Sequence, residues 1–502
     1  MTPLILSAVC VLFIIVIVII LNSYDRKIEK LQEENKRLRD IKIPPGTPEN
    51  PPAPATKKTP DFEITEEYLK VKTFLKERKP VIFIHGGAGT GKSFLIRYLR
   101  EQGLINVLLA PTGLAALNIE GMTIHKFLGL PPTDLFPKGE EHQIPKDHYA
   151  WLQHAKTICI DEISMVRADL LDQIDRSLRS AGDPQKIFGG YQMIFVGDLY
   201  QLPPVVNSKV SQKKTHKPIT SFFRNKTDER NDQQWDSPWF LDADCMKNQP
   251  FERVDLTKVF RQTDHKFISI LNEIREYENL QNNISCINKN ITLRPLPETE
   301  TVTLVLTNNQ ANKINKKKIS SLKNQITYSA AEEGTFCNKN INNKRPVPLH
   351  LTLAEKAFVM ILCNNPDGKF VNGTTGVIES LTKDHVNVRL PNGIVEPIVP
   401  YTWKSYHIEW DNDTRKFKNV EDGSYTQIPL IPAYAITCHK AQGKTLDRVH
   451  LSFAGQAFDP GQTYVALSRV HEISGISSDR TLKMSDFKRD NRLAEFKTMK
   501  WI

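Results

Sequence analysis

Residues 81–93 read VIFIHGGAGTGKS, an apolar run that passes directly into a glycine-rich loop. The apolar run predicts a buried strand. Gly86, Gly91, Lys92 and Ser93 match the spacing G-x-x-x-x-G-K-[ST], in which glycines let backbone N–H groups turn inward around phosphate oxygens. The next residues, KSFLIRYLREQG, have helical periodicity, so the loop should lie at a helix N-terminus, which favours an anion.

The loop predicts a site for ATP and Mg²⁺. Lys92 is expected to reach the β- and γ-phosphates, and Ser93 is expected to ligate the metal. The residues expected to cradle the nucleotide are Gly86, Gly87, Ala88, Gly89, Thr90, Gly91, Lys92 and Ser93. The alternative is a glycine-rich turn with a chance lysine, which the order of strand, loop and helix disfavours.

Two further apolar runs end in polar residues. In TICIDEISM, residues 157–165, Asp161 is expected to ligate Mg²⁺ and Glu162 to act as general base; a helix cap is the alternative. In IFVGDLYQLPPV, residues 194–205, Asp198 and Gln201 are placed to sense the γ-phosphate; a turn at Pro203-Pro204 is the alternative. Strands alternating with helices predict a parallel sheet.

Length and composition add coarser limits. The chain has 502 residues, enough for two or three domains, and its net charge of +10 suits a polyanionic partner. Its 7 cysteines are scattered without C-x-x-C spacing, which argues against both a disulfide framework and a zinc site.

The N-terminal residues predict a membrane anchor and a tether. Residues 4–21 are uncharged and would span about 27 Å as a helix, so we expect a single transmembrane anchor; a cleaved signal peptide is the rival interpretation. Basic residues follow, which places the body on the cytosolic side. The anchor suggests a viral, organellar or nuclear-envelope context. Residues 28–38 have coiled-coil spacing, which predicts either weak self-association or a solvated helix, and a proline-rich tether follows up to residue 60.

Nine segments taken together resemble the petite-integration-frequency type of DNA helicase, in the branch of superfamily one that moves 5′ to 3′. They are GGAGTGKS, LLAPTGLAALNIEGMTIHKFLGL, DEISM, GDLYQLPPV, LTKVFRQTD, LVLTNNQANKIN, AEKAFVMILCNNPDGKFVNGTTGVI, AYAITCHKAQGKTLDRV and TYVALSRV. The segments occur in the family's order and cover most of residues 80–470.

The resemblance implies an α/β fold of two RecA-like P-loop lobes with parallel sheets, ATP between them and a small inserted SH3-like β-barrel. It implies that Arg261 and Arg469 contact the γ-phosphate, that Gly443 lies near the nucleotide, and that Gln442 lies near the seam between the lobes. The residues that the resemblance assigns to DNA are Pro111, Thr112, Thr123, His125, Thr437, His439 and Lys440. Core packing is the alternative for both histidines.

The chain departs from the family's pattern in two places. The glutamine that usually reads adenine has no match in ITEEYLKVKTFLKERKP, where Tyr68 is expected only to pack. Residues 207–234 form a basic insertion, either a DNA-contacting loop or a solvated one.

These observations predict six segments. They are an anchor at 1–23, a coiled-coil candidate and linker at 24–60, a first lobe at 61–250 with a small insertion near 125–150, the first part of a second lobe at 251–349, a β-rich insertion at 350–428 and the rest of the second lobe at 429–502. The expected function is a membrane-tethered ATP-dependent DNA helicase acting on single-stranded and forked DNA. The alternatives are an ATP-regulated scaffold for single-stranded nucleic acid and an RNA helicase.

Overall fold

The structure is a computed structural model. It describes residues 64–130, 144–145, 148–149, 152–204, 206, 235–247, 249–262, 264–293, 300–337, 345–453 and 460–498. The predictions for residues 1–23, 24–60 and 207–234 lie outside these ranges, and so does the proposed self-association through residues 28–38.

The predicted membrane localisation needs correction. Among the described residues, no helix combines the length and the apolar character needed to cross a bilayer. The only support for an anchor was the apolar run at residues 4–21, which lies outside the described ranges.

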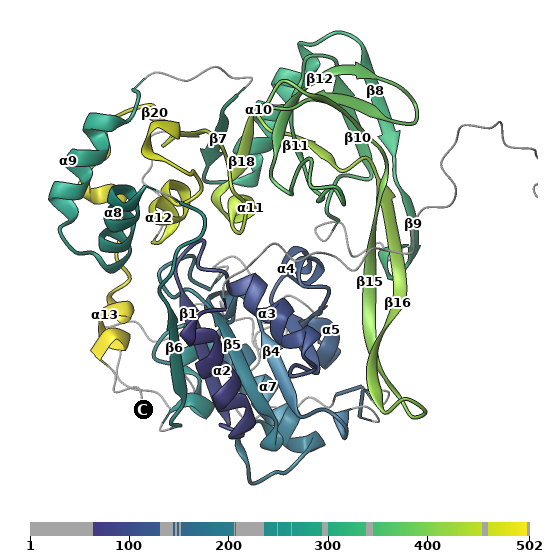
Figure 1. Ribbon diagram of the computed structural model, residues 1–502, viewed down its shortest axis with the longest axis vertical. Coiled ribbons are helices and arrows are strands. Elements are labelled where there is room, and N and C mark those ends of the chain that lie inside the picture. Colours follow the sequence, from purple (N-terminus) through teal and green to yellow (C-terminus); the bar gives the residue numbers. More distant parts are fainter. Residues whose placement is uncertain are drawn as a thin grey trace, which may run out of the picture. The chain divides into compact units, whose positions relative to one another are not determined.

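The first sheet has six strands in the order β3-β2-β4-β5-β1-β6, and all of their pairings are parallel. The strands are β1 (Val81–Gly86), β2 (Val107–Ala110), β3 (Met122–Thr123), β4 (Thr157–Ile160), β5 (Gln192–Gly197) and β6 (Glu252–Leu256). β1, β2, β4 and β5 are buried along their whole length, as expected for a parallel sheet (Figure 1). Their carboxyl ends therefore meet at one edge of the sheet.

Helices and short 3₁₀ turns connect these strands. The helices are α2 (Glu66–Lys76), α3 (Lys92–Glu101), α4 (Gly113–Asn118), α5 (Ile124–Leu128) and α7 (Ala168–Ala181). The 3₁₀ turns are Ile163–Met165, Ile187–Gly190, Phe240–Asp242 and Asp244–Met246. α3 begins after Gly91, whose φ of 84° lies in the left-handed region that favours glycine.

The second parallel sheet has four strands in the order β18-β7-β19-β20. They are β7 (Val302–Val305), β18 (Ala435–Thr437), β19 (Val449–Leu451) and β20 (Ile476–Ser478). The helices around it are α8 (His265–Glu276), α9 (Leu280–Asn290), α10 (Asn308–Ser320), α11 (Cys438–Ala441) and α12 (Gln462–Leu467), with 3₁₀ turns at Ile473–Gly475 and Met484–Asp486. The last helix, α13 (Asn491–Thr498), instead buries Leu493 and Phe496 in the apolar cluster of the first sheet. The first sheet uses six consecutive strands, whereas the second sheet is discontinuous in the sequence, because β7 and β18 are separated by strands of other sheets.

Antiparallel strands occupy the chain between β7 and β18. One sheet has the order β14-β13-β12-β11-β17, another β15-β16-β9, and β10 pairs with β8. Their bounds are β8 (Gln325–Ser329), β9 (Ala331–Gly334), β10 (His350–Ala354), β11 (Phe358–Ile361), β12 (Thr375–Leu381), β13 (Val386–Arg389), β14 (Val395–Ile398), β15 (Tyr401–Asp411), β16 (Lys416–Gln427) and β17 (Leu430–Pro432), with a 3₁₀ turn at Thr335–Cys337.

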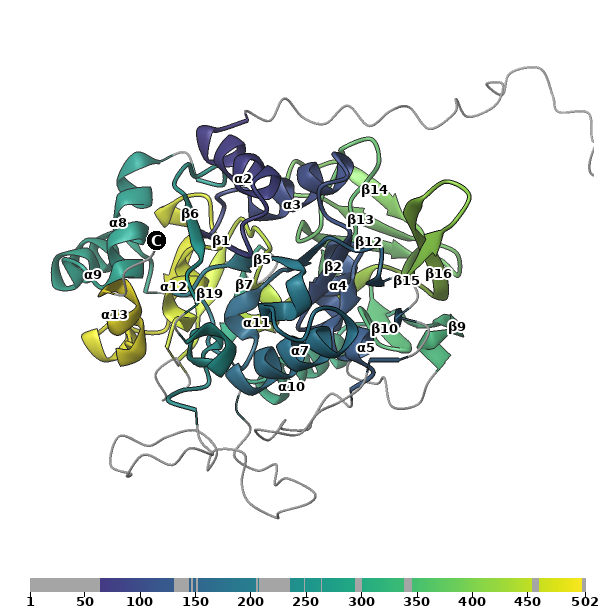
Figure 2. The same cartoon turned by 90° about the horizontal axis from the view of Figure 1, so that it is seen from below.

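β15 and β16 form a long hairpin that packs against the first sheet's side of the chain, next to α4 and α5 (Figures 1 and 2). Ile408 is buried in the same apolar cluster as the strands of the first sheet. The Trp410 ring stacks on His154, with ring centroids 4.1 Å apart. Lys126 Nζ donates to the Tyr406 carbonyl oxygen at 3.0 Å and pairs with Asp422 Oδ2 at 2.5 Å. The hairpin is therefore held at this position by apolar, aromatic and ionic contacts together.

Candidate active site

The glycine-rich loop follows β1 and folds around Lys92. Lys92 Nζ donates to the carbonyl oxygens of Gly86 and Gly87, both at 2.9 Å. Thr90 Oγ1 also donates to Gly87 O, at 3.0 Å. Gly89 has a φ of 80°, so a side chain there would be strained. The sequence motif thus forms a closed cradle, with Ser93 in the first turn of α3.

Tyr68 contacts this loop from α2. Its hydroxyl donates to the Gly91 carbonyl oxygen at 3.2 Å, and its ring stacks with Phe94. The expectation that Tyr68 only packs was therefore incomplete, because the side chain also tethers the loop.

The acid pair lies at the carboxyl end of β4. Asp161 Oδ1 accepts the Glu162 N–H at 2.9 Å. Glu162 has φ 50° and ψ 44°, a left-handed conformation that is uncommon for a residue with a side chain and recurs at functional sites. Burial raises the pKa of Asp161, and burial together with the Asp161 charge raises the pKa of Glu162.

The residues present fit a magnesium ion. Among the described residues, no group of three or more His, Cys, Asp or Glu could hold a metal by itself. Asp161 and Ser93 supply one carboxylate and one hydroxyl, and Mg²⁺ in nucleotide sites is bound by one or two such ligands while phosphates and waters supply the rest. These two ligands suit a Mg²⁺ ion that binds together with the phosphates of a nucleotide.

We call the contact between the part of the chain that holds the first sheet and the part that holds the second sheet the seam. Gln201 and Gln442 link its two sides. Gln201 Nε2 donates to Asp198 Oδ2 at 3.1 Å on the first sheet's side. Gln442, directly after α11, donates to Glu162 Oε2 at 2.9 Å and to Gln201 Oε1 at 3.2 Å. Glu162, Gln201 and Gln442 therefore meet at one point.

Arg261 and Arg469 lie on the second side of this seam. Arg261 donates to the carbonyl oxygens of Ser468 and Gly443, both at 3.3 Å, and its backbone lies against Gly89 of the loop. Arg469 is 1% exposed and donates to the Val465 and Ala441 carbonyl oxygens. Burial, together with the Arg261 charge, lowers the pKa of Arg469 to about 9.

Neither guanidinium forms an ion pair with an acidic residue in the described ranges. Each is satisfied by neutral carbonyl groups, although a guanidinium binds carboxylate or phosphate much more strongly. These two arginines are therefore suited to an incoming anion.

The residues predicted to contact DNA lie at strand ends in both sheets. Ala110 of β2 pairs with Thr123 of β3, which brings Pro111 and Thr112 close to Thr123 and His125. In the second sheet Thr437 ends β18, and His439 and Lys440 lie in α11 directly after it. The three threonines have a common role: each hydroxyl accepts a backbone N–H as the N-cap of a short helix, α4, α5 or α11.

Two residues at the seam were not predicted as site residues from the sequence. Arg275, in α8, pairs with Asp198 at 3.1 Å. Tyr464, in α12, accepts the Ala88 N–H of the loop at 3.1 Å. Arg275 stands in an ordinary amphipathic helix pattern, HKFISILNEIRE, so its sequence gives no signal; Tyr464 lies inside TYVALSRV, but that segment pointed only to Arg469.

Comparison with known proteins identifies the family. The model of the PIF1-like helicase matches residues 65–227. Human PIF1, named an ATP-dependent DNA helicase, is 30% identical over 89% of this chain and 69% of its own length. The crystal structure of Pif1 from Bacteroides sp in complex with ADP-AlF4 is 31% identical, covers 87% of this chain and 97% of that one, and has a TM-score of 0.76.

The chain belongs to the PIF1-like helicase family. The predicted resemblance is thereby confirmed, together with the parallel-sheet α/β core of RecA-like type. The chain spans less than two thirds of some curated relatives, such as 64% of PIF1 from Emericella nidulans, which is 28% identical over 89% of this chain. The Bacteroides protein bound to single-stranded DNA, 33% identical over 87% of this chain and 97% of that one, has a TM-score of 0.59.

These relatives also bear on localisation. Human PIF1 and PIF1 from Emericella nidulans are both named ATP-dependent DNA helicases. The predicted membrane-anchored localisation is wrong on this comparison.

The tight contact between Gly461 and Gln201 leaves no room for a side chain at the seam. Gly461, the N-cap of α12, has a φ of 76°, and a methyl group there would lie 1.8 Å from the Gln201 carbonyl oxygen. Gly461→Ala should therefore loosen the seam. We expect faster amide hydrogen exchange, measured by mass spectrometry, in residues 86–93 and 198–204.

Gly368→Ala is the matched control for this prediction. Gly368 also has a φ of 76°, but nothing lies within 4 Å of an added methyl group. The control introduces similar backbone strain without the clash. Equal exchange at the seam in the two variants would contradict the prediction.

Proposed function

We propose that this chain is an ATP-dependent DNA helicase that moves 5′ to 3′ on single-stranded DNA and unwinds duplex DNA. One observation carries the proposal: residues typical of a nucleotide site face one another across the seam. They are Lys92, Asp161, Glu162 and Gln201 on the first sheet's side, and Arg261, Gln442 and Arg469 on the second sheet's side. The names of the relatives support it. Human PIF1 is called an ATP-dependent DNA helicase, the Bacteroides protein has been solved with single-stranded DNA, and a further structure is described as showing two Pif1 helicases that unwind forked DNA.

In this proposal the first sheet's side binds ATP. Lys92 leaves the carbonyl groups of its own loop for phosphate oxygens, and the backbone N–H groups of residues 86–93 cradle the phosphates. Asp161 and Ser93 would hold Mg²⁺, which neutralises charge on the β- and γ-phosphate oxygens when bound. Glu162 takes a proton from the attacking water, and the Gln442 amide orients its carboxylate.

The second side supplies fixed positive charge. Arg261 and Arg469 move from neutral carbonyl groups to the oxygens of the transferred phosphoryl group, where such arginines contribute factors of roughly 10³ or more to the rate. Because these contacts require the γ-phosphate, ATP and ADP favour different arrangements of the two sides. That difference is what a motor needs for movement.

DNA contacts are assigned to the two groups of strand-end residues. Pro111, Thr112, Thr123 and His125 grip one stretch of backbone, and Thr437, His439 and Lys440 grip the next. A motor that moves on arbitrary sequence must hold phosphates rather than bases, and backbone N–H groups at capped helix starts suit phosphates.

The domain boundaries remain part of the proposal. We assign residues 61–250 to the first lobe, 251–349 and 429–502 to the second, and 350–428 to an SH3-like element that closes over DNA. Strands β8 and β9, which begin at Gln325, pair with strands of this element and extend it toward the N-terminus.

Lys92→Ala should lower ATP hydrolysis by at least about 100-fold and abolish unwinding, because the cradle loses its only ammonium for the phosphates. Folding and some binding of single-stranded DNA should remain. Hydrolysis is measured by phosphate release and unwinding by strand displacement. Lys70→Ala, at an exposed lysine of α2, is the control and should behave as wild type. Unwinding by Lys92→Ala at the wild-type rate would refute the assignment.

A duplex with a 5′ single-stranded tail should be opened, whereas the same duplex with a 3′ tail should not. The chain loads on the tail and moves toward its 3′ end, so only a 5′ tail directs it into the duplex. Strand displacement with fluorescent strands, at matched tail length and sequence, measures both. Opening of the 3′-tailed duplex alone would contradict the proposed direction.

A further inference from the structure

Two side chains from the second side of the seam reach the first half of the phosphate loop. Tyr464, from α12, is 6% exposed and accepts the Ala88 N–H at 3.1 Å. A methyl group on Gly87 would lie 3.3 Å from the Tyr464 hydroxyl and 3.7 Å from Arg275 Nε. The loop is therefore held between its own lysine and this pair of side chains.

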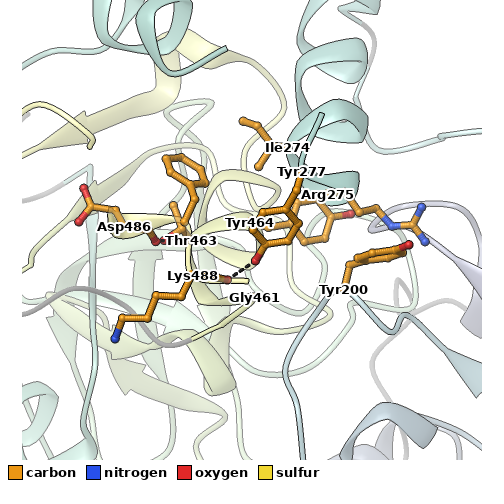
Figure 3. A pocket seen from close by; sticks show the side chains of 10 residues that line it. Tyr200, Ile274, Arg275, Tyr277, Gly461, Thr463, Tyr464, Asp486 and Lys488 are labelled. Atoms are coloured by element: carbon orange, nitrogen blue, oxygen red, sulfur yellow. Dashed lines mark hydrogen bonds between the residues drawn. The ribbon is translucent and has the colours of Figure 1, made fainter. Parts of the chain in front are cut away.

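Arg275 lies across the Tyr200 ring, as Figure 3 shows, with its guanidinium carbon 4.8 Å from the ring centroid. The Nε of Arg275 donates to Asp198 Oδ1 at 3.1 Å, and its Nη2 lies 3.0 Å from His85 Nε2. The Asp198 side chain is fully buried. Burial alone would raise the pKa of Asp198, but the Arg275 charge, with those of His85 and Lys92, outweighs burial and holds that pKa well below its usual range.

Both contacts lead to groups that the proposed mechanism uses. Asp198, held by Arg275, accepts the Gln201 amide, and Gln201 meets Gln442 beside Glu162. Tyr464 lies on the helix whose Val465 carbonyl accepts Arg469 Nε at 2.8 Å. One hydrogen bond therefore links the loop to the helix that accepts Arg469.

We propose that Arg275 and Tyr464 are positioning residues for ATP hydrolysis. They hold the phosphate loop and the Asp198–Gln201 pair at a fixed position relative to the two arginines of the second side, Arg261 and Arg469. This inference rests on the proposed function. Neither side chain is assigned a contact with the transferred phosphoryl group, since Arg275 is engaged by Asp198 and Tyr464 by the loop backbone.

A purely structural role makes a different prediction. Removing one partner of a buried ion pair leaves an unpaired buried charge, and a lost tyrosine hydroxyl costs one hydrogen bond. In that case substitutions would lower the melting temperature and leave the kinetics of the folded fraction unchanged. Positioning should instead lower kcat with little change in KM, because ground-state contacts to ATP remain.

The first test is Tyr464→Phe, assayed for ATP hydrolysis with saturating single-stranded DNA. We expect kcat to fall about fivefold to tenfold, the effect of one hydrogen bond, with KM for ATP within about twofold of wild type. Tyr434→Phe is the matched control: its hydroxyl accepts the Phe358 N–H at 3.1 Å and the residue is 7% exposed, but it does not contact the loop. The control should lose similar stability and keep its kcat.

The second test separates the charge of Arg275 from its geometry. Arg275→Lys should restore part of the kcat that Arg275→Gln loses, because it keeps the charge but not the planar fork. Adding Asp198→Asn to Arg275→Gln should recover the melting temperature, since no unpaired buried charge remains, but not kcat. Recovery of both by the double variant would overturn the inference.

Failure of the inference and failure of the proposed function give different results. Wild-type chain without DNA-stimulated hydrolysis, or Lys92→Ala with normal hydrolysis, would refute the proposed function. Active wild type together with Tyr464→Phe at wild-type kcat would refute only the positioning role. A fall in kcat that matches the fall in folded fraction, measured by thermal melting, would refute it as well.

Discussion

The arrangement of the seam follows from charged groups buried where water is scarce. Lys92, Asp161, Glu162 and Arg469 lie within electrostatic reach of one another, and burial shifts the pKa of each toward its neutral form. A buried charge costs several kcal/mol unless a partner compensates for it. A triphosphate with its metal supplies a negative group for the cations and a positive one for the acids, so the site gains most when both sides of the seam engage the same ligand.

The β15–β16 hairpin constrains the same side of the molecule. Lys126 is adjacent to His125 in the sequence and lies on α5, which Thr123 caps, yet its charge is paired with Asp422 of the hairpin. The chain superposes better on the Bacteroides relative with ADP-AlF4 than on the form bound to single-stranded DNA. The unliganded Bacteroides structure matches nearly as well as the ADP-AlF4 complex, with TM-scores of 0.75 and 0.76, so the described arrangement is closer to the structures without DNA. In this arrangement the Lys126 charge is paired within the chain.

The sequence was informative where chemistry depends on local spacing. The phosphate loop, the acids after β4 and Gln201 after β5 each follow an apolar run, and parallel strands bring their carboxyl ends together. Contacts between distant segments were not predictable: Tyr464 and Ala88 are 376 positions apart, and Arg275 and Asp198 are 77 apart. No pattern within α8 distinguishes Arg275 from a solvated cation. The membrane prediction failed because it rested on the hydropathy of one segment taken alone.

Crystal structures of the chain with ADP and with ADP-AlF4 would test the central claim most directly, namely that the terminal phosphoryl group joins the two sides of the seam. With ADP-AlF4, the guanidinium groups of Arg261 and Arg469 should leave the carbonyl groups of Ser468, Gly443 and Ala441 and lie within hydrogen-bond distance of the fluorides. With ADP they should keep their carbonyl partners. Arginines that stay on those carbonyls in both structures would contradict the claim.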